Sequence, residues 1–200
     1  AVLKHTNPCG LATRDTVLEA WKDALAGDPV SAFGGILICN SKIDLATAEE
    51  INSLFYEVLI ATDFDDDARD LLLKKKKRVL LKINNFYRQD KNFKSILNGV
   101  IQQDMDLKTE SKEDFVCKTK KQPTPAQMDD LVFANKLVKH LKSNTIVIAK
   151  DNQLLGMGCG QTSRVDACHQ AIAKAKKFDF NIEGAAMASD AFFPFPDCVE

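Results

Sequence analysis

The chain has 200 residues, a formal net charge of −1 and a hydrophobic content of 45%, which is typical of a globular protein with one large or two small domains. A net charge so close to zero creates no field that attracts nucleic acid, so we expect no nucleic-acid partner. The sequence has no signal peptide and no apolar run of membrane length, so we expect a cytoplasmic protein without a membrane partner. Its six cysteines form no C-x-x-C pair, which fits a reducing compartment.

Strand and helix patterns alternate through the first part of the chain. An apolar run at residues 1–3 predicts a strand that delivers Lys4 and His5, followed by a turn over residues 6–10. Helical spacing of apolar residues predicts helices over 14–27, 44–56 and 63–77, and strands are predicted over 33–40, 57–61 and 78–83. This alternation indicates a layered α/β fold.

The second part of the chain begins after a less regular segment. Within residues 84–123, the stretches 98–106 and 114–120 are predicted to be strands of a connecting hairpin or sheet extension. A capping box at Thr124 then begins a helix that extends to about residue 142. The later predicted elements are two strands joined at residues 151–152, a helix over 161–178, and a strand that leads into an aromatic turn ending at residue 197.

The two ends of the chain follow one plan. Each runs from a strand through a glycine-containing polar turn into a helix, and then into a strand that meets small residues and phenylalanine. We interpret this as a diverged internal duplication. The predicted domains are a first subdomain over 1–83, a connecting segment over 84–123 and a truncated second subdomain over 124–200. Because the sequence begins inside a strand pattern, we expect a piece of a longer protein with an incomplete site.

Lys4 and His5 form the first candidate site. Histidine exchanges protons near neutral pH, and a neighbouring lysine can stabilise a developing oxyanion. Neighbours in a strand point to opposite faces, so both side chains can serve one site only if the strand has already ended there. From these residues alone, a surface Lys-His pair at a strand end stays open as the simpler interpretation.

Cysteine and glycine motifs offer weaker signals. Cys9 follows Pro8 as in zinc deaminases, but those enzymes need complete H-x-E and P-C-x-x-C motifs. Neither is complete here, so we expect no metal and interpret Cys9 as a packed residue. The GMGCG motif at residues 156–160 lacks the third spaced glycine of dinucleotide sites. It leads into a helix start at residues 161–164 that could receive an anion or a polar heterocycle, or could be an ordinary capped turn.

The aromatic turn near the end of the sequence is a third candidate. Three phenylalanines, Phe192, Phe193 and Phe195, stand with two prolines before Asp197. They could form a rigid wall for a flat ring, with Asp197 accepting hydrogen bonds from the N–H groups of that ring. Core packing, however, explains most such clusters.

Four motifs in this order, KHTNPCG, DPVSAFGG, GCGQTSRVDA and SDAFFPFPD, resemble the AICAR transformylase family, and FYEVLIATDFDDDA fits its bacterial form. The resemblance spans the whole chain. It implies formyl transfer from the co-substrate 10-formyltetrahydrofolate to the 5-amino group of AICAR in IMP synthesis, by a parent protein that also carries IMP cyclohydrolase. It further implies a duplicated cytidine-deaminase-like three-layer α/β/α fold without the zinc, and an intertwined homodimer with shared active sites.

The resemblance also implies roles for individual residues. His5 would be the proton acceptor, and Lys4 would stabilise the transition state. The residues expected to contact AICAR are His5, Gly34, Glu57, Asn144, Arg164 and Phe192. Those expected to contact the folate are Val165 and Asp197, with Pro194 and Phe195 as walls for the pterin.

This sequence departs from the family's pattern in several features. Pro196 stands where the family usually has arginine, which calls the folate contact of Asp197 into question. The cyclohydrolase domain, an upstream arginine-tyrosine pair and a C-terminal stretch are absent, so we expect little or no activity from this chain alone. A catalytically silent folate- or nucleotide-binding module is the rival interpretation, and the presence of both Lys4 and His5 argues against it.

Overall fold

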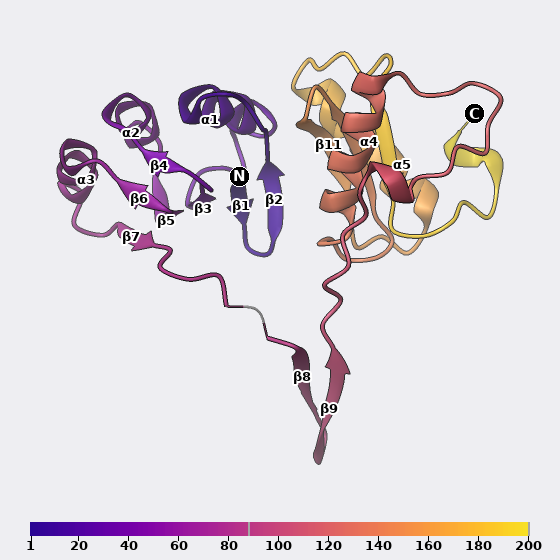
Figure 1. Ribbon diagram of the computed structural model, residues 1–200, viewed down its shortest axis with the longest axis horizontal. Coiled ribbons are helices and arrows are strands. Elements are labelled where there is room, and N and C mark those ends of the chain that lie inside the picture. Colours follow the sequence, from indigo (N-terminus) through magenta and orange to yellow (C-terminus); the bar gives the residue numbers. More distant parts are fainter. Residues whose placement is uncertain (88, 200) are drawn as a thin grey trace.

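Two α/β units and an extended connecting segment make up this computed structural model, which describes residues 1–87 and 89–199 (Figure 1). Each unit has its own sheet and its own buried apolar side chains. The α/β class predicted from the sequence is therefore confirmed. No helix within the described residues is long and apolar enough to cross a membrane.

The first unit contains a mixed five-stranded sheet with the order β2-β1-β3-β5-β7. Strand β1 is antiparallel to β2 and β3, whereas β5 is parallel to β3 and β7. The strands are β1 (Val2–Lys4), β2 (Asn7–Gly10), β3 (Gly35–Ile38), β5 (Tyr56–Ala61) and β7 (Val79–Lys82). The helices are α1 (Val17–Ala26), α2 (Leu45–Asn52) and α3 (Asp66–Leu73), and a short parallel pair is formed by β4 (Lys42–Ile43) and β6 (Asp63–Phe64).

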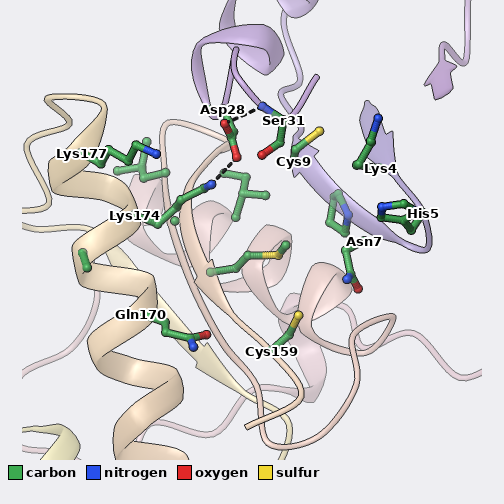
Figure 2. Close-up of a pocket in the computed structure, with 17 residues that line it drawn as sticks. Lys4, His5, Asn7, Cys9, Asp28, Ser31, Cys159, Gln170, Lys174 and Lys177 are labelled. Carbon is green, nitrogen blue, oxygen red and sulfur yellow. Dashed lines mark hydrogen bonds and ion pairs between the residues drawn. The ribbon is translucent and has the colours of Figure 1, made fainter. Parts of the chain in front are cut away.

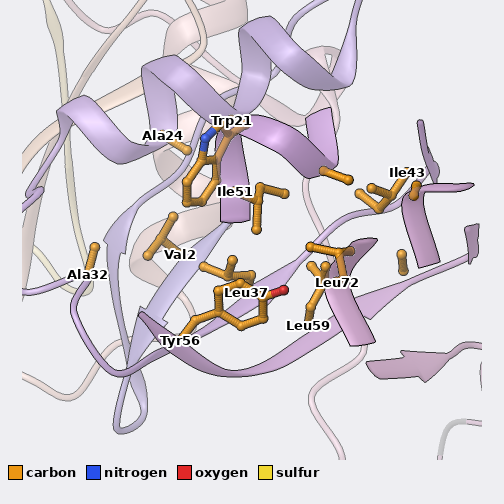
Figure 3. Close-up of a cluster of buried hydrophobic side chains, with 13 residues drawn as sticks. Val2, Trp21, Ala24, Ala32, Leu37, Ile43, Ile51, Tyr56, Leu59 and Leu72 are labelled. Atoms are coloured by element: carbon orange, nitrogen blue, oxygen red, sulfur yellow. The ribbon is translucent and has the colours of Figure 1, made fainter. Parts of the chain in front are cut away.

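One apolar core joins the three helices to one face of this sheet (Figure 3). Trp21 comes from α1, Leu72 from α3, and Leu37 and Leu59 from the neighbouring strands β3 and β5. Because neighbouring strand residues point to opposite faces, Leu37 is buried whereas Ile38 is 36% exposed. The apolar spacing that predicted the helices thus covers one face of the sheet.

The second unit is a three-stranded antiparallel sheet between two helices. Its strand order is β11-β10-β12. Val147 and Ala149 of β10 pack with α4, whereas Ile146 and Ile148 of the same strand pack with α5. The elements are α4 (Pro125–Val138), β10 (Ile146–Lys150), β11 (Gln153–Gly158), α5 (Arg164–Lys177) and β12 (Ala186–Ser189).

The two sheets share one local topology. In the first unit, β1 lies between β2 and β3, and α1 connects β2 to β3. In the second unit, β10 lies between β11 and β12, and α5 connects β11 to β12. The common plan seen in the sequence therefore has a counterpart in strand order.

The connecting segment differs from the sequence prediction. Its hairpin consists of β8 (Lys91–Ile96) and β9 (Gly99–Asp104), joined by a two-residue turn. The predicted strand over 114–120 is wrong: Asp114 ends the short 3-10 helix η1 (Lys112–Asp114), and residues 115–120 are irregular. The loop between β8 and β9 has two residues, whereas a loop from the end of β9 to residue 114 would have nine. The shorter loop costs less entropy to close, which favours pairing of β9 with β8.

The helices occupy the predicted segments but are mostly shorter. The capping box is present, since Thr124 accepts from Gln127 N and the Gln127 side chain accepts from Thr124 N. Ser163 caps α5 by accepting from Asp166 N, so this helix begins at residue 164. Each cap satisfies a backbone donor at a helix start that otherwise has no partner.

The two units meet along a short backbone seam beside α1 and β11. Leu154 N donates to Leu11 O at 2.8 Å, and Thr13 N donates to Asn152 O at 3.0 Å. Beside this seam, Lys174 of α5 forms an ion pair with Asp28, whose other oxygen accepts from Ser31 N at 3.0 Å. The seam therefore combines sheet-like hydrogen bonds with an ion pair between a buried carboxylate and a partly exposed ammonium.

Replacing Asp28 with alanine should lower the free energy of unfolding by about 1–3 kcal/mol, because it leaves the Ser31 N–H without its acceptor and the partly exposed Lys174 ammonium without its partner carboxylate. Burial opposes ionisation of Asp28, but hydrogen bonds from Lys174 and Ser31 hold its pKa below the usual value. A lowered carboxyl pKa stabilises the fold above the unfolded value, and this contribution is lost as the pH falls below about 4. Urea unfolding of wild type and Asp28→Ala at pH 7 and pH 3 measures this contribution of the carboxylate.

The matched control for this prediction is Lys22→Ala, which removes an ion pair whose side chains are both about half exposed. We expect that change to have little effect. A stability difference between wild type and Asp28→Ala that is as large at pH 3 as at pH 7 would contradict the role assigned to the carboxylate.

Candidate functional site

The turn that carries His5 brings it to the same cavity as Lys4. Strand β1 ends at Lys4, which pairs with Asn7 of β2, so residues 5–6 form the turn of a hairpin. His5 has φ 56°, a left-handed conformation that is uncommon for a non-glycine residue. The strand has therefore ended at His5, and both side chains line one cleft. The structure also corrects the predicted turn over 6–10, because residues 7–10 form β2.

Lys4 is held by the small-residue turn that precedes β3. Its Nζ donates to Phe33 O at 2.6 Å and to Gly34 O at 3.2 Å. Gly34 has φ 69°, and its N donates to Phe55 O at 2.8 Å. A Cβ at Gly34 would lie 3.0 Å from the Lys4 Nζ. The structure thus places the predicted residues Lys4 and Gly34 together. Glu57, another predicted site residue, is exposed and lies two residues after Phe55 in the sequence.

A cleft of about 510 Å³ opens beside this turn, between the two units (Figure 2). Lys4 and His5 lie on one side of it, and α5 lies on the other with Lys174 and Lys177. Cys9 also lines the cleft, and its thiol donates to Val2 O at 3.4 Å. The cleft has the size of a small-molecule site.

The chemistry of Cys9 fits a packed thiol. Burial and the nearby Asp28 carboxylate raise the pKa of the Cys9 thiol, so it stays protonated at neutral pH. Within residues 1–87 and 89–199, no three His, Cys, Asp or Glu side chains gather as a metal site would require.

Arg164 organises a second polar cluster at the start of α5. Its guanidinium donates to Asn144 Oδ1 at 2.8 Å, to Ser189 Oγ at 2.8 Å and to Asp190 Oδ1 at 2.5 Å. Burial opposes ionisation of Asp190, but hydrogen bonds from Ser143 and Thr145, together with Arg164, hold its pKa below the usual value. The cluster therefore keeps a charged pair next to the amide of Asn144.

The aromatic turn follows β12 and lies at the surface. Phe192 is 80% exposed and Phe195 is 67% exposed. This excludes core packing within the chain as the explanation for these two rings. Pro196 begins the short 3-10 helix η2 (Pro196–Cys198), which also carries Asp197, and η2 contacts α5. Val165 lies half-buried in the first turn of α5.

The predicted site residues therefore fall into three groups. Lys4, His5 and Gly34 gather at the β1–β2 hairpin, Asn144 and Arg164 gather at the start of α5, and the aromatic residues share one turn. The cleft beside Lys4 and His5 is lined by none of the second and third groups. Within the described residues of one chain, the structure does not bring all the predicted residues to one cavity.

Sequence reasoning missed several residues that shape these groups. Asp28 belongs to the DPVSAFGG motif and Asp190 to SDAFFPFPD, but only the structure shows what each carboxylate contacts. Phe55 was not singled out, although its carbonyl accepts from Gly34 N and its ring centroid lies 5.0 Å from that of Phe33. Lys174 stands in a lysine-rich helix end with no sequence signal that distinguishes it.

Comparisons with known proteins agree with these motifs. A family model described as the AICARFT/IMPCHase bienzyme matches residues 1–174. The chain is 60% identical over 200 residues to the bifunctional purine biosynthesis protein PurH of Bacteroides thetaiotaomicron, covering 100% of this chain and 39% of that protein. It is 47% identical to the protein of the same name from Caldicellulosiruptor saccharolyticus, covering 99% of this chain and 38% of that protein. It is also 47% identical to the one from Aquifex aeolicus, covering 100% of this chain and 39% of that protein. The chain thus spans about two fifths of the length of these relatives.

Proposed function

The chain belongs to the AICARFT/IMPCHase bienzyme family. We therefore propose that the turn between β1 and β2 carries the formyl-transfer residues of a longer enzyme of purine biosynthesis. The reaction moves a formyl group from 10-formyltetrahydrofolate to the 5-amino group of AICAR. The longer protein would also carry IMP cyclohydrolase and act in the cytoplasm. The observation that carries this proposal is the convergence of Lys4 and His5 on one cleft.

The chemistry assigns each side chain a step. The AICAR nitrogen attacks the formyl carbon, and a tetrahedral intermediate with a negative oxygen forms. Lys4 stabilises that oxygen, and His5 accepts the proton released by the nitrogen. Collapse of the intermediate breaks the bond to N10 of the folate, which leaves as tetrahydrofolate after receiving a proton. The proposal includes no metal.

The remaining predicted residues are assigned to substrate binding. Gly34, Glu57, Asn144, Arg164 and Phe192 would bind AICAR together with His5. Arg164 and Asn144 support this assignment because they already form one hydrogen-bonded cluster. The residues assigned to the folate are Val165, Pro194, Phe195 and Asp197, and the exposure of the Phe195 ring supports a role as a wall for the pterin.

We also propose that the fold is a duplicated cytidine-deaminase-like one, with subdomains at 1–83 and 124–200. The matching strand orders of the two sheets support the duplication. The position of the second sheet between α4 and α5 supports a three-layer arrangement there.

A homodimer with shared active sites is the proposed assembly. The separation of the predicted residues into different groups supports it, because a second copy could supply the group that one cleft lacks. The β8–β9 hairpin gives further support: Phe93 is 60% exposed and Val100 is 65% exposed. An isolated two-stranded hairpin is seldom stable in water without a surface to cover it.

The direct test is AICAR-dependent release of tetrahydrofolate from 10-formyltetrahydrofolate, measured for the longer protein and for this chain alone. We expect turnover by the longer protein and little or none by the 200-residue chain. If the longer protein bound folate or nucleotide but gave no turnover, the silent binding module would replace this proposal. Appreciable turnover by the chain alone would contradict the need for further segments.

Replacing Gly34 with alanine in the longer protein should lower turnover several-fold, because the new Cβ would lie 3.0 Å from the Lys4 Nζ and shift the ammonium by a few tenths of an ångström. The substitution also strains the backbone at φ 69° by about 1–2 kcal/mol. Gly184→Ala is the matched control, because Gly184 has φ 73° and no atom within 4 Å of a built Cβ. Equal turnover in the two variants would contradict the idea that the turn at Gly34 positions the Lys4 ammonium for catalysis.

A further inference from the structure

The direction of the Lys4 ammonium depends on the turn that contains Phe33 and Gly34. An ammonium has three donors, and Lys4 gives two of them to the carbonyls of these residues. Within the described part of the chain its ammonium makes no other hydrogen bond. Because the nitrogen is tetrahedral, the two bonds fix the direction of the third donor. A shift of the turn would therefore change where that donor points.

This turn is supported by Phe55, the last residue before β5. The Gly34 N–H donates to the Phe55 carbonyl at 2.8 Å, and the ring centroids of Phe33 and Phe55 lie 5.0 Å apart. The turn leads into β3 and Phe55 leads into β5, and the two strands pair in parallel from Gly35 and Tyr56 onward. The position of the turn therefore depends on the connection between α2 and β5, residues 53–55.

Arg78, the residue immediately before β7, fixes that connection. Its guanidinium donates to Leu54 O at 2.9 Å, to Asn52 O at 3.1 Å and to Asn52 Oδ1 at 2.6 Å. Arg78 is 8% exposed, and its guanidinium carbon lies 4.3 Å from the centroid of the Tyr56 ring. A planar guanidinium with several donors can hold neighbouring carbonyls in one arrangement.

The charge of Arg78 is matched by carbonyls and an aromatic ring. Over residues 1–87 and 89–199 it takes part in no ion pair with a carboxylate. The Asn52 carbonyl lies at the end of α2, where the helix dipole is negative, and the ring of Tyr56 attracts a cation to its face. A buried cation is costly without such partners. Displacing these carbonyls would therefore leave the guanidinium unmatched, which favours one position of the connection.

We propose that Arg78 is a positioning residue for formyl transfer and that it acts through Lys4. This inference rests on the proposed function. Arg78 fixes the connection that ends at Phe55, Phe55 supports the turn, and the turn directs the Lys4 ammonium. Arg78 does not line the cleft beside Lys4, so it takes no part in the chemical step itself.

The test replaces Arg78 with methionine in the longer protein, with and without Lys4→Ala. Methionine keeps an unbranched apolar stem and removes the donors. With Lys4 present, we expect Arg78→Met to lower kcat about tenfold, with KM for both substrates within about twofold of wild type. In the Lys4→Ala background we expect no further loss, because no ammonium remains to be misdirected. Single-turnover assays at high enzyme concentration keep the slow variants measurable.

The matched control is Lys75→Met, for which we expect an unchanged kcat. Lys75 is exposed and donates to the same Asn52 carbonyl at 2.8 Å, but among the described residues it has no hydrogen bond to Leu54. An unchanged kcat in Arg78→Met would overturn the proposal. A loss by the same factor with and without Lys4 would also overturn it, because it would indicate a general structural effect.

Circular dichroism and urea unfolding show whether Arg78→Met folds. If it does not, Asn52→Ala replaces it in the same test. That substitution removes the side-chain oxygen that accepts from Arg78, at a residue that is only partly buried. We expect a smaller loss of kcat that again requires Lys4. No loss, or an equal loss in the Lys4→Ala background, would contradict the role of Arg78.

Failure of the proposed function would be seen separately, as wild-type protein without AICAR-dependent turnover. Hydrogen exchange of the Gly34 N–H then still tests the link, because that group donates to Phe55 O. Faster exchange in Arg78→Met but not in Lys75→Met would support the link between Arg78 and the turn. Exchange that Arg78→Met leaves unchanged would overturn it.

Discussion

His5→Ala in the longer protein is expected to lower kcat for formyl transfer by about 100- to 10,000-fold, the range typical for loss of a general base. The reason is that His5 sits in a turn, at φ 56°, with its side chain on the cleft that Lys4 also lines. Steady-state release of tetrahydrofolate measures the effect. Thr6→Ala is the matched control, because Thr6 is the other residue of the same turn and is exposed.

Lys4→Ala is expected to lower kcat by a similar factor, since it removes the cation next to the developing oxyanion. A separate structural loss is expected to be small, because among residues 1–87 and 89–199 the Lys4 side chain donates hydrogen bonds to just two backbone carbonyls, at Phe33 and Gly34. Urea unfolding of the variant checks this point. If turnover were unchanged in either variant, the pair would be an ordinary polar turn and the base would have to lie elsewhere.

Mixing two inactive variants should restore activity. In a dimer with shared sites, His5→Ala and Asn144→Ala would damage opposite halves of each site. A mixed dimer then has one intact site and one that carries both changes, so random exchange of subunits should give about a quarter of wild-type turnover. The basis for this expectation is that the cleft beside His5 is lined by neither Asn144 nor Arg164.

The control for the mixing experiment is His5→Ala combined with Lys4→Ala. Both of these changes fall on the same hairpin, so their mixed dimers should have no intact site. Differently tagged subunits show whether mixed dimers have formed. Proven mixed dimers of His5→Ala and Asn144→Ala without restored turnover would contradict shared sites.

Local patterns in the sequence predicted most elements correctly. The capping box at Thr124 and the turn at residues 151–152 are both present, and those two turn residues have positive φ values as a tight hairpin requires. Such features depend on neighbours within a few residues. The pairing of β8 with β9 was missed because the strand over 91–96 carries no regular alternation of apolar and polar residues, and both its faces are exposed.

Tertiary contacts of the site could not be predicted in the same way. Motif resemblance selected Lys4, Gly34 and Arg164, and the structure shows that each makes specific polar contacts. Nothing in the sequence indicated that Asp28 would meet Lys174, because 146 positions separate them and the contact depends on how the two units meet.

The measurement that tests the central claim most directly is AICAR binding together with turnover, for wild type and His5→Ala of the longer protein. We predict that the variant binds AICAR within a few-fold of wild type, since five other residues are assigned to the same substrate, while its turnover falls by orders of magnitude. Turnover that survives the substitution, or that falls only in proportion to lost AICAR binding, would contradict a catalytic role for His5.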